Sequence, residues 1–264
     1  MIIFFDIDGT LIDTKTWTVA ESTKEAIRKA RENGHLCIIN TGRTEKLIGK
    51  DWTEEIQFDG YLLGCGTMVI YRGEVLMHET FPLELSLRIM ERLEHYGIDV
   101  ILEGRENNFY KPSQEMNTET FRKYVSVYES FAKAEDVTNP ALAPGKFDKF
   151  FAYVDEVERM DGFRQEFEEE LDFIDRENGF YEVVPKGYSK ATAIQFFADT
   201  VGIPLTDTVA IGDSNNDLAM LEYAGCAIAM GNSSKPVFEI ADYVTTDVDK
   251  DGIWNALNWL GVLD

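Results

Sequence analysis

Two aspartates stand at the end of the first apolar stretch of this chain. Ile2–Phe5 is typical of a buried strand, and Asp6 and Asp8 follow it at once, with Gly9 and Thr10 suited to a tight turn. A carboxylate buried without a partner is costly, and two neighbouring carboxylates also repel each other. Oxygen ligands in a tight turn suit a hard cation such as Mg²⁺. The pattern therefore predicts a strand that ends at a metal site or, in the simpler interpretation, an acidic strand end followed by an ordinary turn.

Strands and helices alternate in the first and last thirds of the chain. The spacing of Ser22 and Glu25 matches a capping box, which predicts a helix start, and Gly34 is placed to end that helix. Short apolar strands are predicted at Leu36–Ile39, Tyr61–Leu63, Met68–Tyr71, Val75–Glu79, Val209–Ile211 and Cys226–Met230. Buried strands separated by helices predict an α/β fold with a doubly wound, mostly parallel, Rossmann-like core.

The middle of the chain has a different pattern. Two long amphipathic helices are predicted at Leu83–Tyr96 and Glu156–Glu170, beside strands that come in pairs. The predicted strands are Ile98–Leu102, Asn108–Lys111, Phe147–Tyr153, Leu171–Ile174 and Phe180–Val184. Helices that pack on an antiparallel sheet form an α+β domain. We therefore expect a core domain made of residues 1–81 and 185–264, with an α+β cap domain at 82–184 inserted between its two parts.

The charge of the chain limits its partners. It has 48 acidic and 25 basic residues, a formal net charge of −23, and such a surface repels nucleic acids and anionic membranes. No apolar run is long enough to cross a bilayer, and the first residues lack the features of a signal peptide. The three cysteines, Cys37, Cys65 and Cys226, have no paired metal-ligand spacing. These observations predict a cytoplasmic protein, with neither nucleic acid nor membrane as a partner.

Polar residues suited to phosphoryl transfer follow the predicted strands or begin a helix. In an open parallel sheet, the loops at the carboxyl ends of the strands meet even when they are distant in sequence. A carboxylate there can attack phosphorus, and a second one can protonate the leaving oxygen and then deprotonate water. A hydroxyl, a backbone N–H and a lysine can hold the phosphoryl oxygens, and a third carboxylate can complete the shell of Mg²⁺. The residues in question are Asp6, Asp8, Thr41, Gly42, Lys190, Asp213, Asn216 and Asp217.

The segments that carry these residues resemble the four motifs of the haloacid dehalogenase superfamily. The four are DIDGT from Asp6, NTGR from Asn40, the lysine at Lys190, and GDSNND from Gly212. The intact second aspartate of the first motif is similar to that of the superfamily's phosphatases rather than its dehalogenases. The resemblance therefore implies a phosphatase.

The resemblance also implies a role for each residue. Asp6 would be the nucleophile and Asp8 the general acid and base. Asp217 would support the lysine and the metal shell, and Mg²⁺ would be held by Asp6, the Asp8 carbonyl and Asp213. Phosphate would be bound by Thr41, Gly42, Lys190 and Asn216. Arg43 follows the phosphate-binding turn, where we expect it to reach the phosphate or the sugar, with a surface ion pair as the alternative.

The place of the insertion indicates which branch of the superfamily the chain resembles. The stretch from Thr41 to Lys190 has room for a domain, whereas the stretch before Thr41 does not. That arrangement is similar to the C2-type cap of Cof-like sugar phosphatases, and Pro185–Lys190 and Ala229–Asn232 also look like that branch. The chain departs from the branch at Cys65, where asparagine is common. A packed thiol is the expectation there, with a thiol nucleophile as the alternative.

These features together predict a Mg²⁺-dependent phosphatase for a small phosphorylated metabolite, with a sugar phosphate as the leading substrate class. The cap would close, exclude water and supply specificity. Two alternatives share the motifs: a hexose phosphomutase, which would protect its phosphoenzyme from water, and a silent phosphometabolite-binding protein without turnover. The intact set of Asp6, Asp8, Lys190 and Asp213 favours an enzyme over the silent protein.

Overall fold

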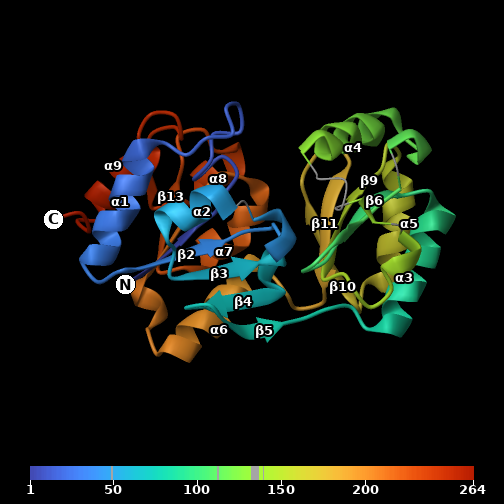
Figure 1. The fold of residues 1–264 in the computed structure, drawn as a ribbon, viewed down its shortest axis with the longest axis horizontal. Coiled ribbons are helices and arrows are strands. Elements are labelled where there is room, and N and C mark those ends of the chain that lie inside the picture. Colours follow the sequence, from blue (N-terminus) through green and yellow to red (C-terminus); the bar gives the residue numbers. More distant parts are fainter. Residues whose placement is uncertain (49, 112, 132–136, 139) are drawn as a thin grey trace. The chain divides into compact units, whose positions relative to one another are not determined.

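The computed structural model describes residues 1–48, 50–111, 113–131, 137–138 and 140–264, which form two compact units (Figure 1). The first unit consists of Met1–Gly42, Ile48–His78 and Ser189–Asp264, and the second of Arg43–Leu47 and Glu79–Tyr188. The predicted fold class, a mostly parallel α/β core with an inserted α+β part, is confirmed by the sheets of the two units. The domain limits drawn from the sequence, at residues 82 and 185, stay a prediction.

The first unit is built on one twisted sheet. Its strands follow the order β14 (Tyr243–Val244), β13 (Cys226–Ala229), β12 (Thr208–Gly212), β1 (Ile2–Phe5), β2 (Leu36–Asn40), β3 (Gly60–Leu63), β4 (Met68–Tyr71) and β5 (Glu74–His78). Pairing is parallel from β14 to β3 and antiparallel from β3 to β5. Because β1 lies between β12 and β2, the loops that follow these three strands meet at one edge of the sheet.

Helices cover both faces of this sheet. Side chains alternate along its buried strands, so each strand contributes apolar residues to both faces. Ile3 and Phe5 belong to the core beneath α1 (Glu21–Glu32), α2 (Lys50–Ile56) and α9 (Gly252–Trp259). Phe4 points to the opposite face, where its ring meets Phe197 edge-on at 6.1 Å. The helices on that face are α6 (Lys190–Val201), α7 (Leu218–Tyr223) and α8 (Lys235–Ile240). The first unit is therefore a doubly wound α/β structure.

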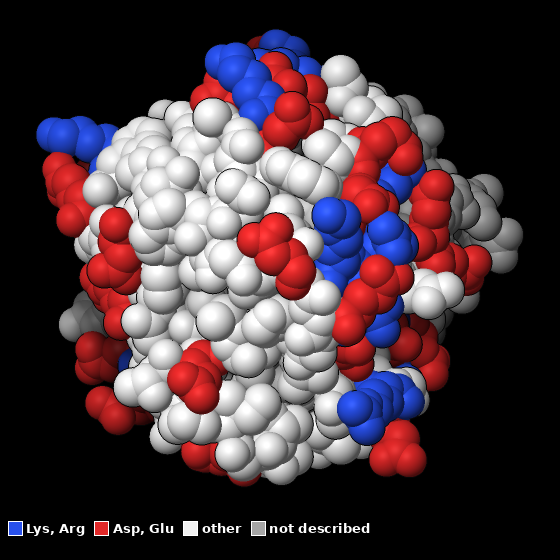
Figure 2. Space-filling view, turned by 90° about the vertical axis from the view of Figure 1, so that its left-hand side faces the viewer, with Lys and Arg blue, Asp and Glu red and all other residues white. Residues whose placement is uncertain are grey.

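Two basic residues of α1 pair with acids on the same helix. Lys24 pairs with Glu21, and Arg28 pairs with Glu25 and Glu32. Figure 2 views the molecule from the side on which α1 and α9 lie in Figure 1. It shows Lys and Arg side chains beside Asp and Glu at the borders of a broad area in which the visible charged residues are isolated acids. The basic residues visible on this face therefore lie beside acidic ones, which lowers the local positive charge.

The second unit is a sheet with helices on both faces. The strands follow the order β10 (Leu171–Asp175), β11 (Phe180–Pro185), β9 (Lys149–Tyr153), β6 (Asp99–Glu103), β7 (Asn108–Phe109) and β8 (Val137–Thr138). Neighbouring strands are antiparallel, except that β7 and β8 are parallel. One face packs on α3 (Leu83–Tyr96) and α5 (Val157–Phe167), through residues such as Phe150 and Phe163. The other face packs on α4 (Glu119–Phe131), where Phe121 stacks on Tyr153.

A tight turn joins β4 and β5, and the helix cap predicted from the sequence is wrong. Arg72 and Gly73, between β4 and β5, have φ values of 50° and 83°, which is the backbone that a two-residue hairpin turn requires. Helix α1 begins at Glu21, and Ala20 rather than Ser22 is its N-cap. The Ser22 hydroxyl donates to Asp251 Oδ1 at 2.6 Å instead. The Ser22 hydroxyl thus bonds to a residue distant in sequence rather than to the helix end, where the local spacing had placed it.

A buried ion network lies on the sheet of the second unit. Lys149 Nζ on β9 lies 2.9 Å from Glu103 on β6 and 2.9 Å from Glu182 on β11. Arg176 also pairs with Glu182. Burial raises the pKa of Glu103 even though Lys149 opposes that change. The network supplies each of these charges with a partner, without which its burial would be costly.

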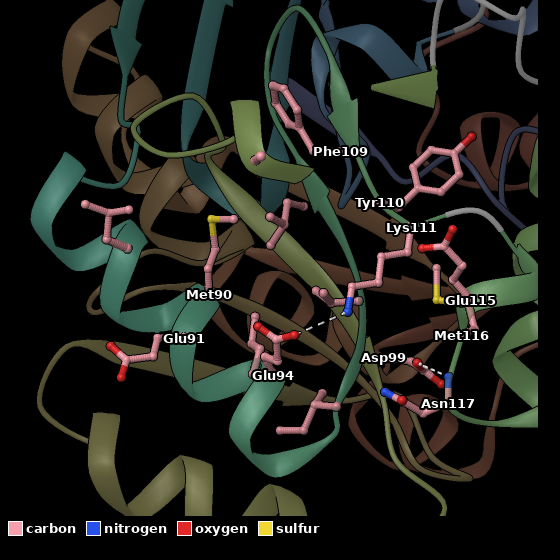
Figure 3. A pocket seen from close by; sticks show the side chains of 16 residues that line it. Met90, Glu91, Glu94, Asp99, Phe109, Tyr110, Lys111, Glu115, Met116 and Asn117 are labelled. Atoms are coloured by element: carbon pink, nitrogen blue, oxygen red, sulfur yellow. Dashed lines mark hydrogen bonds and ion pairs between the residues drawn. The ribbon is translucent and has the colours of Figure 1, made fainter. Parts of the chain in front are cut away.

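The second unit also contains a pocket of about 960 Å³ (Figure 3). It lies between α3, β6 and the segment that follows β7, and apolar side chains such as Met90 line it beside acids. The Asp99 carboxylate accepts the Asn117 N–H at 2.8 Å, and Lys111 Nζ lies 3.9 Å from Glu94. None of the residues predicted for phosphoryl transfer lines this pocket.

Cys37, Cys65 and Cys226 are present as thiols and do not form disulfides. Cys37 and Cys65 are buried, and burial raises the pKa of Cys37. Within the described ranges, no helix has both the length and the apolar character needed to cross a membrane.

Candidate active site

The loop after β1 places two aspartates at the edge of the sheet. The Asp6 N–H donates to the Ile211 oxygen of β12 at 3.0 Å, which extends the strand pairing by one residue, and the Asp6 side chain is buried. The chain then turns, and the Gly9 N–H donates to the Ile12 oxygen at 2.9 Å. Asp8 lies half-buried in this turn. The two carboxylates predicted from DIDGT therefore leave the same strand end.

The turn after β1 is packed directly on the loop after β12. Gly9 has a φ of 86°, and a Cβ at this position would lie 2.3 Å from Asp213 Oδ2. Thr10 Oγ1 donates to Asp213 Oδ1 at 2.9 Å. The first and last motifs thus touch through one carboxylate, which leaves no room for a larger residue at Gly9.

Lys190 joins the two acidic loops. Its Nζ lies 2.6 Å from Asp6 Oδ1 and 2.6 Å from Asp217 Oδ1, and its side chain is buried. Burial alone would lower the pKa of Lys190, but Asp217 and Asp6 raise it above its usual value. The side chain is therefore a fixed cation at the end of β1.

Asp217 holds both the lysine and the loop that follows β12. Its Oδ1 accepts from Lys190, and its Oδ2 accepts the N–H groups of Asp213 at 2.9 Å and Ser214 at 3.0 Å. A Cβ on Gly212 would lie 2.6 Å from Asp217 Cγ, so the last residue of β12 must be small. Both carboxylate oxygens of Asp217 are thus engaged, one with the lysine and the other with the loop after β12.

Three carboxylates could hold a divalent metal ion. Oxygens of Asp6, Asp213 and Asp217 all lie within 4.8 Å of one another. Burial, followed by the charge of Asp217, raises the pKa of Asp6 to about 7 and that of Asp213 to about 8. In the described part of the chain, the site has three carboxylates but one buried cation, Lys190, so positive charge is missing there. A hard cation bound by carboxylate oxygens would supply the missing positive charge, so the donor set fits a divalent metal.

The predicted phosphate-binding residues lie in the same unit, with one exception. Thr41 follows β2 and is buried, with its N–H bonded to the Leu62 oxygen at 2.9 Å. Asn216 is also buried, and Ser214 Oγ lies 2.8 Å from its Oδ1. Arg43 is the exception, because the segment Arg43–Leu47 belongs to the second unit.

Within that unit, the segment after the predicted phosphate-binding turn contacts the later part of the same unit. Glu45 Oε2 lies 2.6 Å from Arg105 Nε, and Arg43 Nη1 donates to the Leu47 oxygen at 3.3 Å. The role of Arg43 at the phosphate or the sugar stays a prediction.

Cys65 is placed as a structural residue rather than as an exposed thiol. It is fully buried, and its N–H donates to the Thr41 oxygen at 3.0 Å. Its φ of 55° lies in the left-handed region, where residues other than glycine and asparagine are uncommon. Packing, the expectation from the sequence, agrees with this burial.

Asn232 holds the turn after β1, a role that its position in the sequence did not predict. Its Nδ2 donates to the Gly9 oxygen at 2.8 Å, and its Oδ1 accepts the Val248 N–H at 2.8 Å. The only signal in the sequence was its place at the end of Ala229–Asn232, just after a predicted strand. That position predicted the edge of the sheet but not the bond to Gly9.

Comparisons with known proteins agree with the fold and the arrangement of the site. The sequence model of the haloacid dehalogenase-like hydrolases matches residues 3–257. The putative phosphatase YkrA of Bacillus subtilis is 30% identical, over 99% of this chain and 98% of that protein. The 5-amino-6-(5-phospho-D-ribitylamino)uracil phosphatase YitU of B. subtilis is 25% identical, over 96% and 94%. The structure of the HAD subclass IIB sugar phosphatase BT4131 is 25% identical, with a TM-score of 0.84 over 99% of each chain.

The chain belongs to the haloacid dehalogenase-like hydrolase family. Within it the chain is a Cof-like phosphatase, and thus a phosphoric monoester hydrolase, as the motifs and the place of the insertion predicted.

Proposed function

We propose that this protein hydrolyses a small phosphorylated metabolite with the help of Mg²⁺, through an aspartyl-phosphate on Asp6. The observation that carries the proposal is the position of Lys190 Nζ, 2.6 Å from both Asp6 and Asp217. A buried cation beside a buried carboxylate, at the edge where parallel strands end, is suited to bind an anion next to a nucleophile.

In the first step, an oxygen of Asp6 attacks phosphorus and the bond from phosphorus to the leaving oxygen breaks. Asp8 donates its proton to that leaving oxygen, so the alcohol departs uncharged. Asp8 is suited to this role because it leaves the same turn as Asp6 and is only half-buried, which allows it to exchange protons with water.

In the second step, water attacks the phosphorus of the aspartyl-phosphate. Asp8, now a carboxylate, takes the proton from that water, and the bond from phosphorus to the Asp6 oxygen breaks. Phosphate is released, Asp6 is again a carboxylate, and Asp8 again carries a proton. The two aspartates therefore return to their starting state after each turnover.

The remaining residues hold the phosphoryl group and the metal. We propose that Mg²⁺ is bound by the Asp6 carboxylate, the Asp8 carbonyl and Asp213, and when bound it would neutralise charge on the phosphoryl oxygens. Asp217 keeps Lys190 and the loop after β12 in place. The phosphoryl oxygens are bound by Thr41, Gly42, Lys190 and Asn216, with Arg43 as a further ligand.

The leading substrate class is a sugar phosphate. Relatives similar over nearly the whole chain carry names that specify small phosphorylated metabolites, among them a phosphoribityl compound, and a similar solved structure is described as a sugar phosphatase. A net charge of −23 disfavours long-range attraction of anions. The local cations at the site therefore have to supply the attraction.

A substrate panel tests this proposal. The purified protein is incubated with Mg²⁺ and hexose phosphates, pentose phosphates, pyridoxal phosphate or p-nitrophenyl phosphate, while free phosphate and isomerised sugar are both followed. We expect phosphate release that is lost with chelator and in Asp6→Asn. Asp199→Asn, an exposed acid on α6, is the matched control and should keep full activity. Isomerised sugar without free phosphate would favour a phosphomutase, and the absence of turnover with intact Mg²⁺ binding would favour a silent binding protein.

A further inference from the structure

A side chain without a role in the proposed mechanism connects two of the motifs. Asn40 is the last residue of β2, directly before Thr41, and it is fully buried. Its Nδ2 donates to the main-chain oxygen of Lys190 at 3.0 Å, across 150 residues of sequence. The strand that carries the phosphate-binding turn is thereby bonded to the first residue of α6.

The main chain at the start of α6 is held from other sides as well. Ser189 Oγ accepts the Thr192 N–H at 3.1 Å, and the Ser189 N–H donates to Thr192 Oγ1 at 2.9 Å. A Cβ on Gly66 would lie 2.2 Å from the Ser189 oxygen, so that glycine packs against the same turn. The lysine stem is flexible, so the position of its ammonium group depends on where its main chain is fixed.

The amide of Asn40 can serve this bond in one orientation only. Its Nδ2 has to face the Lys190 oxygen, and its Oδ1 then points elsewhere and has no hydrogen-bond partner among the described residues. A buried polar atom without a partner loses its bonds to water without compensation, which is unfavourable. Asparagine is also disfavoured within strands. Stability alone would favour an apolar residue at this position, which leaves the bond to Lys190 as the reason for an amide.

We propose that Asn40 is a positioning residue that fixes the main chain of Lys190, and so keeps the lysine ammonium between Asp6 and Asp217. Because Asn40 is joined by a peptide bond to Thr41, it also fixes the distance between two predicted phosphate ligands on different elements. The inference rests on the proposed function, since it assigns Asn40 an effect on phosphate binding and turnover through Lys190.

A double-mutant cycle separates this role from a general contribution to folding. Asn40→Ala, Lys190→Ala and the double variant are compared with the unmodified protein in kcat/KM for p-nitrophenyl phosphate and in Tm. We expect Asn40→Ala to lower kcat/KM by about 10- to 100-fold, since a small misplacement of a catalytic group can cost that much. In the Lys190→Ala background the same change should alter kcat/KM less than about twofold, because the group it positions is gone. An equal loss in both backgrounds would overturn the proposal.

Thr208→Val is the matched control. Thr208 begins β12 at the opposite end from Asp213, and its buried Oγ1 donates to the Leu205 oxygen at 2.6 Å. This variant removes two bonds between a buried side chain and the main chain, because Thr208 Oγ1 also accepts the Gly225 N–H at 3.0 Å. Tm should therefore fall while kcat/KM stays unchanged. A comparable loss of kcat/KM in Thr208→Val would show that any weakening of the core lowers activity, and would overturn the proposal.

Asn40→Asp gives a second readout if the alanine variant fails to fold. The carboxylate form presents only acceptors to the Lys190 oxygen, whereas the protonated acid can donate as the amide does. The activity of Asn40→Asp, divided by that of the unmodified protein at the same pH, should therefore rise as pH falls. A ratio that is independent of pH would contradict the proposed bond.

Calorimetry of inorganic phosphate binding in the presence of Mg²⁺ separates a failure of the proposed phosphatase function from a failure of the positioning role of Asn40. A protein that binds phosphate without turning over any substrate would contradict the proposed function, and weaker phosphate binding in Asn40→Ala than in Thr208→Val would still support the positioning role. A protein that neither binds phosphate nor turns over substrate would overturn both.

Discussion

Lys190 Nζ lies 2.6 Å from Asp6 Oδ1, although 184 residues separate the two in the chain. The same nitrogen lies 2.6 Å from Asp217 Oδ1. One buried cation thus joins the end of β1 to the loop after β12. The site should therefore be sensitive to the loss of that single charge, both in folding and in turnover.

Replacement of this lysine tests its double role. Lys190→Met leaves Asp6 and Asp217 buried without their common partner, and breaking a buried ion pair typically costs about 3–5 kcal/mol of unfolding free energy. Loss of one group that stabilises the transition state should lower kcat by about 10²- to 10³-fold. Denaturant unfolding and steady-state kinetics measure the two effects. Lys235→Met, on the exposed start of α8, should change neither.

Metal binding should stabilise the protein more at high pH than at low pH. The pKa values of Asp6 and Asp213 are raised by burial and by Asp217. Without metal, the folded state therefore holds protons that the unfolded state has already released, and stability falls as pH rises through these pKa values. Bound Mg²⁺ would offset the charge that remains at high pH. We expect the Mg²⁺-induced rise in Tm to be larger at pH 8.5 than at pH 6.

The control for this linkage is Asp213→Asn, which removes one of the two raised groups. Its Tm in chelator should depend less on pH, and Mg²⁺ should raise it less. An equal effect of Mg²⁺ on Tm at both pH values in the unmodified protein would contradict the assignment of these carboxylates as the metal site.

Two glycines with the same backbone angle allow a test of the packing at the first motif. Gly9 and Gly34 both have a φ of 86°, but a Cβ meets Asp213 at 2.3 Å only at Gly9, and at Gly34 it meets open space. Gly34→Ala should therefore show only the backbone cost, about 1 kcal/mol. Gly9→Ala should also displace Asp213, with a larger fall in Tm and a loss of turnover. Similar Tm and activity in the two variants would contradict the packing described for the turn after β1.

The three buried charges of Glu103, Lys149 and Glu182 should contribute to the stability of the folded protein as a unit. Lys149→Met leaves Glu103 and Glu182 without their shared cation and should lower the unfolding free energy by about 3–5 kcal/mol. The triple variant Glu103→Gln, Lys149→Met, Glu182→Gln removes all three charges and should recover part of that loss. Urea unfolding measures both, and a triple variant that is less stable than Lys149→Met would show that the carboxylates contribute independently of the lysine.

Much of the candidate site was predictable because its residues follow apolar strands. Asp6 and Asp213 each come directly after such a strand, and parallel strands end at the same edge of a sheet, so their proximity followed from the pattern. Lys190 was predicted at a helix start, and the structure brings it into contact with Asp6.

The contacts that depend on one distant main-chain atom were not predictable. Asn40 donates to the oxygen of Lys190, and Asn232 donates to the oxygen of Gly9. An oxygen acceptor of this kind exists at every residue, so the partner leaves no mark in the sequence. The error at Ser22 has a different cause, because its hydroxyl donates to the side chain of Asp251, which is distant in sequence, rather than to the helix end that the spacing predicted.

The central claim is that Asp6 carries the phosphoryl group during turnover. The most direct test is acid quenching of the protein during turnover of p-nitrophenyl phosphate with Mg²⁺, followed by borohydride reduction and mass spectrometry of the N-terminal peptide. Reduction converts an aspartyl-phosphate to homoserine, so we predict homoserine at position 6, with Asp8 unmodified and no conversion in Asp6→Asn. Phosphate release without any modification at position 6 would contradict the account.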